Sequence, residues 1–113
     1  MSKVSDVTDD GGVAVFAALG DENRQRLLDL LAARGDASAA ELAGRLGVSR
    51  QGALKHLAVL ERAGLVGATR HGRLVHYSVR TGELERSAIR LQALAATWER
   101  RLAGMKSAAE GTR

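Results

Sequence analysis

Residues 47–66, GVSRQGALKHLAVLERAGLV, carry three side chains that suit the recognition of nucleic acid: Arg50, Gln51 and Lys55. Arginine, glutamine and lysine make bidentate or strong single hydrogen bonds to guanine, adenine and phosphate. At about 100° per residue of helix, Gln51 and Lys55 lie opposite an apolar stripe, and Arg50 lies on its shoulder. A lone basic helix face is more often simply solvated. The neighbouring elements must therefore decide between a solvated face and a DNA-reading face.

The elements before this stretch favour DNA reading. Ser49 is a predicted N-cap for a helix over residues 49–63, whose buried stripe consists of Ala53, Leu57 and Leu60. The segment Ser38-Ala-Ala-Glu41 is a capping box that opens a short preceding helix, and Gly47-Val48 forms the turn between the two. Two capped helices joined by a tight turn predict a helix-turn-helix, which presents its second helix to the major groove.

A β-hairpin is predicted directly after this helix. LVGATR and RLVHYSV are rich in strand-forming residues and are separated by His71-Gly72, the kind of pair found in two-residue hairpin turns. Val75, Tyr77 and Val79 alternate on one face of the second strand. Arg70 and Arg73 flank the predicted tip, where they can reach the sugar-phosphate backbone or a minor groove.

The outer segments of the chain predict packing helices. Asp21 is a candidate N-cap for a helix that ends at Gly35, and VAVFAAL before it is short and apolar. Residues 83–105 are expected to form one long helix with a heptad stripe of Leu84, Ala88, Leu91, Ala95, Trp98, Leu102 and Met105. This stripe is longer than one small domain needs to cover. We therefore expect a homodimer through the terminal helices, with Phe16 and Leu19 also in the interface.

Composition limits the class of protein. The 113 residues suit one domain over residues 13–105, with flexible tails at 1–12 and 106–113. Residues 45–80 hold seven Lys/Arg against one Asp/Glu, whereas residues 1–44 hold four against eight. This basic middle third indicates an anionic partner, most often nucleic acid. The chain has no cysteine, which excludes disulfides and thiolate metal sites. With no signal peptide and no membrane-spanning run, a cytoplasmic location is expected.

The order of elements, mainly α with a small β-hairpin (α-α-α-α-β-β-α), resembles the ArsR family of bacterial winged helix-turn-helix repressors. ALGDENRQRLLDLL, SAAELAGRLGVSRQGALKHLAVLERAGLV and HGRLVHYSV carry the resemblance, which covers roughly residues 13–105. It implies a homodimer that binds a palindromic operator on double-stranded DNA and represses transcription. The resemblance implies that Arg50, Gln51, Leu54 and Lys55 face the DNA and that Gly72 and Arg73 form the wing tip. Together with Ser49 and Arg70, the predicted DNA-binding residues are Ser49, Arg50, Gln51, Leu54, Lys55, Arg70 and Arg73.

Leu54 departs from the family, whose members commonly have serine there. Its apolar side chain on an exposed shoulder is either incidental or a contact to a thymine methyl group, and the two interpretations are evenly balanced. Of the three histidines, His56 falls on the buried side and is expected to be packed and hydrogen-bonded. His71 is expected to be exposed, with a phosphate contact as the alternative. His76 alternates away from the apolar face.

Many members of the family release DNA on binding a metal ion, through cysteines on the first helix of the helix-turn-helix or through Asp and His on the last helix. This chain has Ala39-Ala-Glu-Leu-Ala43 at the first position and neither Asp nor His over 83–105. No metal site, cofactor or catalytic residue is predicted, and an enzyme is not expected. A winged-helix protein-interaction module and a repressor released by a small organic ligand remain as alternatives; the sequence does not identify an inducer.

Overall fold

Side-chain caps determine where the helices of the N-terminal half begin. The computed structural model describes residues 12–111, so most of the predicted tail at 1–12 lies outside the described residues. In chain order the elements are a helix over residues 12–19, α2 (Glu22–Arg34), β1 (Ala37–Ser38), α3 (Ala39–Leu46), α4 (Arg50–Arg62), β2 (Val66–His71), β3 (Leu74–Val79) and α5 (Gly82–Gly111).

Three predicted N-caps are confirmed. Asp21 Oδ1 accepts a hydrogen bond from the amide of Arg24 at 3.1 Å, and Ser49 Oγ accepts one from the amide of Gly52 at 2.9 Å. The capping box is complete, because Ser38 Oγ accepts from the amide of Glu41 at 3.2 Å and the Ser38 amide donates to Glu41 Oε1 at 2.9 Å. Caps of this kind stabilise a helix start by about 1 kcal/mol each.

The hairpin supplies two strands of a three-stranded antiparallel sheet with the order β1-β3-β2, in which β3 is the central strand. The two-residue strand β1 was not predicted; Ala37 pairs with Tyr77 and Ser38 with His76. The turn is displaced by one residue from the predicted His71-Gly72 pair, because His71 pairs with Leu74 and leaves Gly72 and Arg73 as the turn. Gly72 has a φ of 66°, which a glycine at the first central position of a hairpin turn adopts readily.

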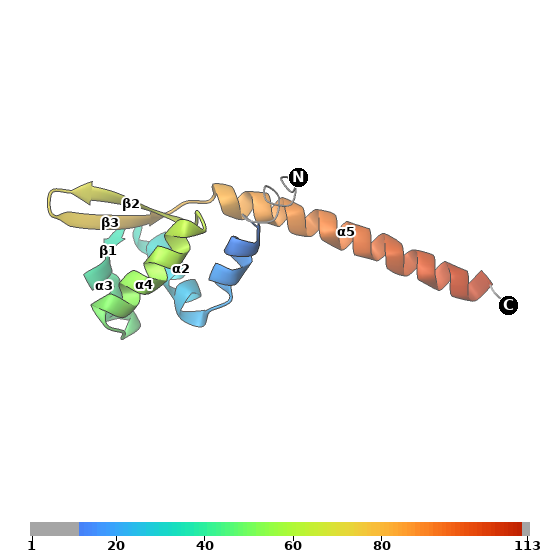
Figure 1. Cartoon of the computed structure of the whole chain (residues 1–113), viewed down its shortest axis with the longest axis horizontal. Helices are drawn as coiled ribbons and strands as arrows, with labels where there is room; N and C mark the ends of the chain where they lie inside the picture. The colour runs from blue at the N-terminus through green and yellow to red at the C-terminus, as the bar shows by residue number, and fades with distance from the viewer. Residues whose placement is uncertain (1–11, 112–113) are drawn as a thin grey trace, which may run out of the picture.

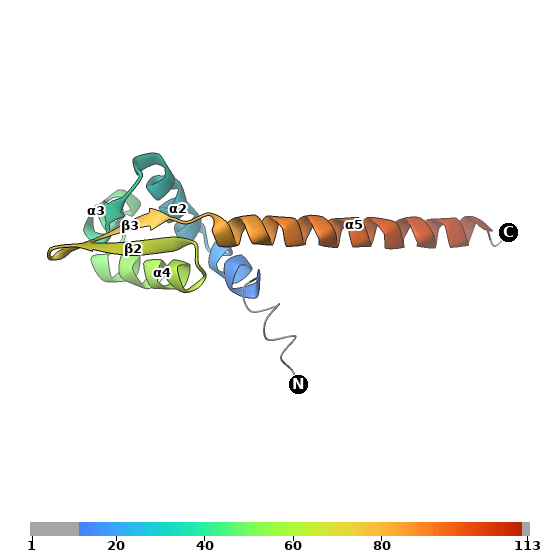
Figure 2. The same ribbon diagram turned by 90° about the horizontal axis from the view of Figure 1, so that it is seen from above.

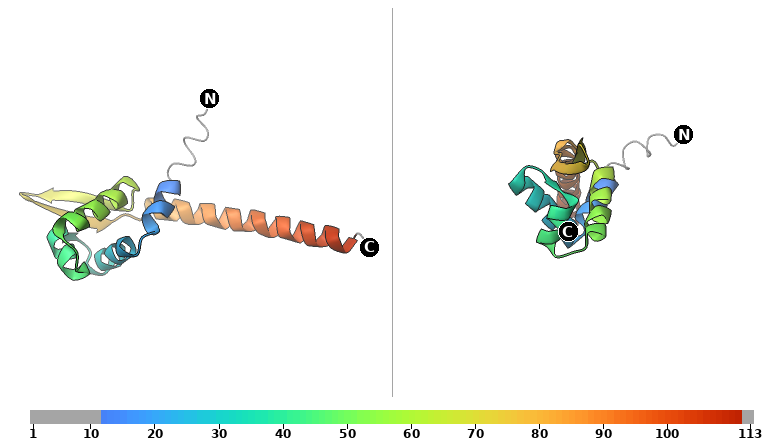
Figure 3. Two further views of the ribbon diagram at one scale, coloured as in Figure 1. Left: turned by 60° about the horizontal axis from the view of Figure 1, so that its bottom comes forward. Right: turned by 90° about the vertical axis from the view of Figure 1, so that its left-hand side faces the viewer.

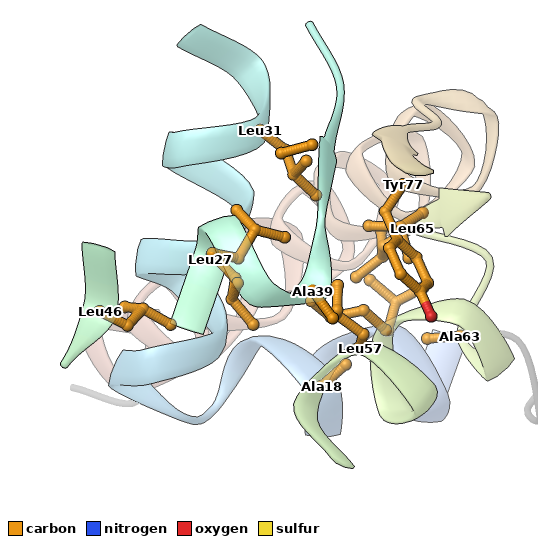
Figure 4. Close-up of a cluster of buried hydrophobic side chains, with 14 residues drawn as sticks. Ala18, Leu27, Leu31, Ala39, Leu46, Leu57, Ala63, Leu65 and Tyr77 are labelled. Atoms are coloured by element: carbon orange, nitrogen blue, oxygen red, sulfur yellow. The ribbon is translucent and has the colours of Figure 1, made fainter. Parts of the chain in front are cut away.

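The core lies between the helices and the inner face of the sheet (Figure 4). Its largest fully buried side chains are Leu27, Leu31, Leu42, Leu57, Leu60, Leu65, Val15 and Val66. Tyr77 of β3 closes this cluster from the sheet side, and Val75 and Val79 pack against it, as their alternation predicted. The core therefore joins α2, α3, α4 and the hairpin into one body.

Helix α5 leaves this body and projects far beyond it (Figures 1 and 2). The molecule consequently measures 71 × 35 × 21 Å. Viewed along its length, α5 recedes behind the body, and helix 12–19 lies beside its first turns (Figure 3). The helix continues to Gly111, whereas the sequence predicted an end at residue 105 and a tail over 106–113.

Candidate nucleic-acid interface

Helix α4 is anchored on its buried side by the predicted stripe. Leu57 and Leu60 are fully buried, as is Ala53. His56, also on the inner side, is half-buried, and its Nδ1 lies 3.5 Å from Nη1 of Arg24, as expected for a packed, hydrogen-bonded histidine. Because a guanidinium can only donate, this contact requires a neutral His56 that accepts at Nδ1.

Arg24 connects this helix to the N-terminal part of the body. Its Nε donates to the carbonyl of Ala18 at 2.7 Å, and its Nη2 donates to the carbonyl of Ala17 at 3.2 Å. The same guanidinium therefore satisfies the C-terminal carbonyls of helix 12–19 and contacts α4. Buried leucines and one shared arginine thus fix the orientation of α4 relative to the first helix.

The outer side of α4 carries the predicted recognition residues. Arg50, Gln51 and Lys55 are all exposed, and the first turn of the helix contains no acidic residue. Ser49 is exposed as well, although its Oγ already accepts the capping hydrogen bond. Leu54 differs from the expected exposed shoulder position, because it is half-buried and packs against the core. It still borders the surface beside Arg50.

The hairpin tip lies next to the start of α4. A hollow of about 170 Å³ separates them, and its walls include Arg50 and Leu54 of α4 together with Arg73 and Leu74 of the hairpin. The first turn of α3, Ala39-Ala40, lines a third side. Arg70 is exposed on β2, where it pairs with Val75. The structure therefore brings Arg50 and Arg73 to one hollow. The tip of the β2–β3 hairpin lies at the end of the molecule opposite the C-terminus (Figure 1).

Sequence reasoning missed Leu74 as a residue of this surface. Its side chain is 59% exposed and lines the hollow beside Leu54. The signal was its apolar character directly after the turn, on a strand whose inward residues are Val75, Tyr77 and Val79. An apolar residue at a wing tip does not contribute to the core and can contact a ligand instead.

The other two histidines lie on the outer face of the sheet. His76 Nδ1 lies 3.3 Å from Asp36 Oδ2, and the His71 and His76 rings meet edge to face with centroids 5.5 Å apart. His71 is exposed at the end of β2, as expected. Over residues 12–111, no three His, Cys, Asp or Glu side chains are grouped closely enough to hold a metal ion.

The predicted interface residues of α5 lie on an uncovered stripe: Leu84, Ala88, Leu91, Ala95, Trp98 and Leu102 are all exposed. Phe16 on helix 12–19 is also exposed, whereas Leu19 is half-buried against the core. The described residue of α5 that is buried is Ser87. Despite the length of α5, no helix within residues 12–111 combines the length and apolarity needed to cross a membrane.

A capped helix-turn-helix followed by a hairpin with basic residues at its tip defines a winged-helix DNA-binding protein. A helix-turn-helix domain model matches residues 19–66. The structure resembles an ArsR-like transcriptional regulator from Rhodococcus sp. RHA1, with a TM-score of 0.79 and 44% identity over 90% of this chain and 95% of that one. The chain belongs to the ArsR family of transcriptional regulators.

A second similar structure is the winged helix-turn-helix DNA-binding domain Mb0332 from Mycobacterium bovis, a homodimer described as a possible ArsR-family regulator. It has a TM-score of 0.66 and 28% identity over 85% of this chain and 88% of that one. A comparison with curated protein sequences gave no match.

Proposed function

We propose that the chain is a homodimeric repressor that binds a palindromic operator on double-stranded DNA. The observation that carries this proposal is the placement of Arg50 and Arg73 on the two sides of one hollow. A helix start and a hairpin tip that both expose arginine at one end of the body suit the simultaneous contact of a major groove and the adjacent backbone.

Each polar or charged residue among the predicted DNA-binding residues has a proposed role. Arg50, Gln51 and Lys55 extend from the first turns of α4 toward base edges, which is where a recognition helix makes its sequence-specific contacts. Arg70 and Arg73 on the hairpin contact phosphates or the minor groove. Ser49 caps α4, and its hydroxyl hydrogen remains free to donate to a phosphate.

Dimerisation is proposed to occur through α5 and helix 12–19. The exposed stripe from Leu84 to Leu102, together with Phe16, is apolar surface that a second copy of the chain can cover. The homodimeric state of the related Mb0332 domain supports this arrangement. Two-fold symmetry would then place the two α4 helices about one DNA turn, ~34 Å, apart.

We further propose that DNA affinity does not depend on a metal ion. Over residues 39–43 the chain has Ala-Ala-Glu-Leu-Ala, and α5 over Gly82–Gly111 contains no His and no Asp. The two ligand sets associated with metal sensing in the family therefore have no counterpart here. Zinc is expected to leave operator affinity unchanged, and a large loss of affinity on adding zinc would contradict this proposal.

The competing candidate is a winged helix that binds another protein. A protein-interaction module has no need for charge of one sign on both α4 and the hairpin tip. This chain nevertheless exposes four basic side chains on α4 and the hairpin: Arg50, Lys55, Arg70 and Arg73. The excess of positive charge on this surface therefore favours DNA over a protein partner.

Fluorescence anisotropy with labelled duplexes tests the proposal. DNA from upstream of the gene and a scrambled duplex are compared at two salt concentrations, with wild type and Arg50→Ala. Specific binding is expected to exceed non-specific binding by about 10³-fold or more, and Arg50→Ala is expected to remove most of that preference. Arg26→Ala, an exposed arginine of α2, serves as the matched control. Equal, salt-sensitive binding to both duplexes would contradict a sequence-specific regulator.

A further inference from the structure

A second hollow lies where the body meets α5. It has a volume of about 400 Å³, which falls in the usual range of small-molecule sites, about 300 to 1,000 Å³. Its apolar walls are Leu19, Leu28, Ala32, Leu65, Val79 and Leu84. We call this hollow the junction pocket, because its walls come from helix 12–19, from α2, from the base of the hairpin and from the first turn of α5.

The polar groups of the junction pocket are few. Gln25, Asp29 and Arg80 complete its lining. The amide nitrogen of Gln25 is already used, since it donates to the carbonyl of Leu19 at 2.6 Å. Among the ion pairs and side-chain hydrogen bonds of the described residues, none involves the guanidinium of Arg80. A cationic group beside an apolar hollow is therefore available to a ligand.

The backbone around Arg80 positions this cation. The Arg80 amide donates to the carbonyl of Leu65 at 2.8 Å, which ties the residue to the base of the hairpin. The guanidinium lies directly over Gly67, where an added Cβ would come within 2.8 Å of its Cζ. A glycine at position 67 therefore leaves room for the Arg80 side chain to lie across β2 at this edge of the pocket.

We propose that the junction pocket binds a small organic acid, with its apolar body among the leucines and its carboxylate on Arg80. Arginine suits this role because its planar fork matches a carboxylate bidentately. Asp29 also lines the pocket. Its carboxylate disfavours a second negative charge on the ligand, so we expect a monoanion with an apolar body. This binding activity goes beyond DNA recognition and does not depend on it.

The pocket connects the two functional parts of the molecule. Leu65 and Val79 belong to the base of the hairpin whose tip carries Arg73, and Leu84 belongs to the helix proposed to dimerise. A ligand that contacts both can favour one orientation of α5 relative to the hairpin. Its differential affinity for the two orientations would then change the affinity of the dimer for DNA.

Calorimetry with three matched probes tests the site in the full-length protein: 3-phenylpropanoate, 3-phenylpropanol and 3-phenylpropylamine. The acid is expected to bind at least tenfold more tightly than the alcohol and the amine, since tenfold corresponds to one good charge-assisted contact. Arg80→Gln should remove this preference, whereas Arg26→Gln, on the exposed side of α2, should keep it. Equal binding of the three probes, or no binding of any at millimolar concentration, would overturn the proposal.

A filling substitution locates the binding site. Ala32 lines the pocket and is exposed, so Ala32→Phe should occupy the hollow without disturbing the core and should abolish binding of the acid. Ala33→Phe adds the same side chain to the next, also exposed, position outside the pocket and should leave binding intact. Unchanged binding in Ala32→Phe would place the acid elsewhere and overturn the assignment.

Two further measurements distinguish failure of the ligand proposal from failure of the DNA-binding proposal: sedimentation reports dimerisation, and fluorescence anisotropy reports operator binding. If Ala32→Phe dissociates the dimer while no acid binds the wild type, the partner subunit occupies the hollow and the ligand proposal fails. Operator binding without any probe is measured in parallel. If the wild-type protein does not bind the operator, the DNA-binding proposal is refuted. If the same sample binds the acid, the junction-pocket proposal still stands.

Discussion

Leucines in the body and leucines on α5 have opposite surroundings. Leu27, Leu31, Leu42, Leu57 and Leu60 are fully buried, whereas Leu91, Leu94 and Leu102 are 49%, 50% and 60% exposed. Both sets have helical spacing, and spacing alone predicts only that a helix has an apolar face. The body covers its own apolar faces. The apolar face of α5 remains uncovered in the single chain, so its burial depends on another molecule.

This difference in burial predicts that the stability of the body and the contribution of α5 to stability respond differently to protein concentration. The body should unfold with a free energy that does not depend on protein concentration, because its core contacts are all within one chain. The contribution of α5 should grow with concentration, because mass action couples folding to association. Substitutions in the two regions can therefore be distinguished by varying the concentration of the protein.

The largest expected effect is in the body. Leu57→Ala removes a fully buried side chain from α4 and should lower the free energy of unfolding by about 3 kcal/mol, from lost burial and the cavity that remains. Urea denaturation at several protein concentrations measures this effect, which should be the same at each. Leu91→Ala is the matched substitution on α5. An equally large, concentration-independent loss in Leu91→Ala would show that α5 packs within its own chain.

The next effect concerns the dimer. Trp98 is half exposed, and Arg101 lies over its ring at 5.1 Å. Trp98→Ala should weaken dimerisation by about 2 kcal/mol, roughly thirtyfold in Kd, since large aromatic anchors dominate interfaces. Analytical ultracentrifugation at nanomolar to micromolar concentration measures the change.

Arg100→Ala, on the face of α5 opposite the stripe, is the control for Trp98→Ala and should leave the dimer intact. A Trp98→Ala protein that stays fully dimeric at nanomolar concentration would move the interface away from the α5 stripe.

Leu54 is neither fully buried like the body leucines above nor uncovered like those of α5, because it packs against the core and also borders the hollow beside Arg50. Leu54→Ser should relax the preference for thymine at one position of each half-site by about fourfold, the value of ~0.8 kcal/mol for one methyl-sized contact. A panel of single-base operator variants measures it, with Leu54→Met as the volume-conserving control. An unchanged preference would assign Leu54 to packing alone.

The smallest effect concerns pH. The amide of Ser38 donates to Glu41, and Arg34 Nη2 lies 3.1 Å from Glu41 Oε2, so both hold the pKa of this carboxyl below its ordinary value of 4.5. A carboxylate with a lowered pKa stabilises the folded state above its ordinary pKa, and this stabilisation is lost as the pH falls below it. The Tm of the wild type should therefore decrease more steeply than that of Glu41→Gln from about pH 5 downward. If the Tm of the wild type and of Glu41→Gln fell equally steeply with pH, the ionised Glu41 carboxylate would not stabilise the start of α3.

The capping signals made most of the body predictable. Asp21, Ser38 and Ser49 all cap the helices that they were expected to cap, and the stripe of α4 is buried as its spacing indicated. The reason is that these signals are local: a cap and its amide are three residues apart. The membership of the family and the winged-helix fold followed from the order of such local elements.

The elements that were missed or displaced depend on other information. Strand β1 has only two residues and therefore has no periodicity, and it forms because β3 offers it an edge at Tyr77 and His76. The turn moved by one residue because Gly72, with its positive φ, occupies the first central position. Helix α5 passes residue 105 because SAAE contains good helix formers and no stop signal.

The candidate site was predicted only in part for a similar reason. The residues Arg50, Gln51 and Lys55 follow from one helix, whereas the exposure of Leu74 and the half-burial of Leu54 depend on how the hairpin meets α4. The junction pocket has walls from several distant segments, so no stretch of sequence indicates it.

The length of α5 has a mechanical consequence. Its 30 residues, at a rise of about 1.5 Å each, make a rod of about 45 Å. A tilt of about 5° at the base would carry the far end through about 4 Å, about three quarters of the pitch of an α-helix. A small tilt of α5 near Leu84, in the wall of the junction pocket, is therefore amplified into a large displacement of the far end of the helix. In the proposed dimer, in which two α5 helices pack along their length, a small tilt near Leu84 would alter the distance between the two α4 helices.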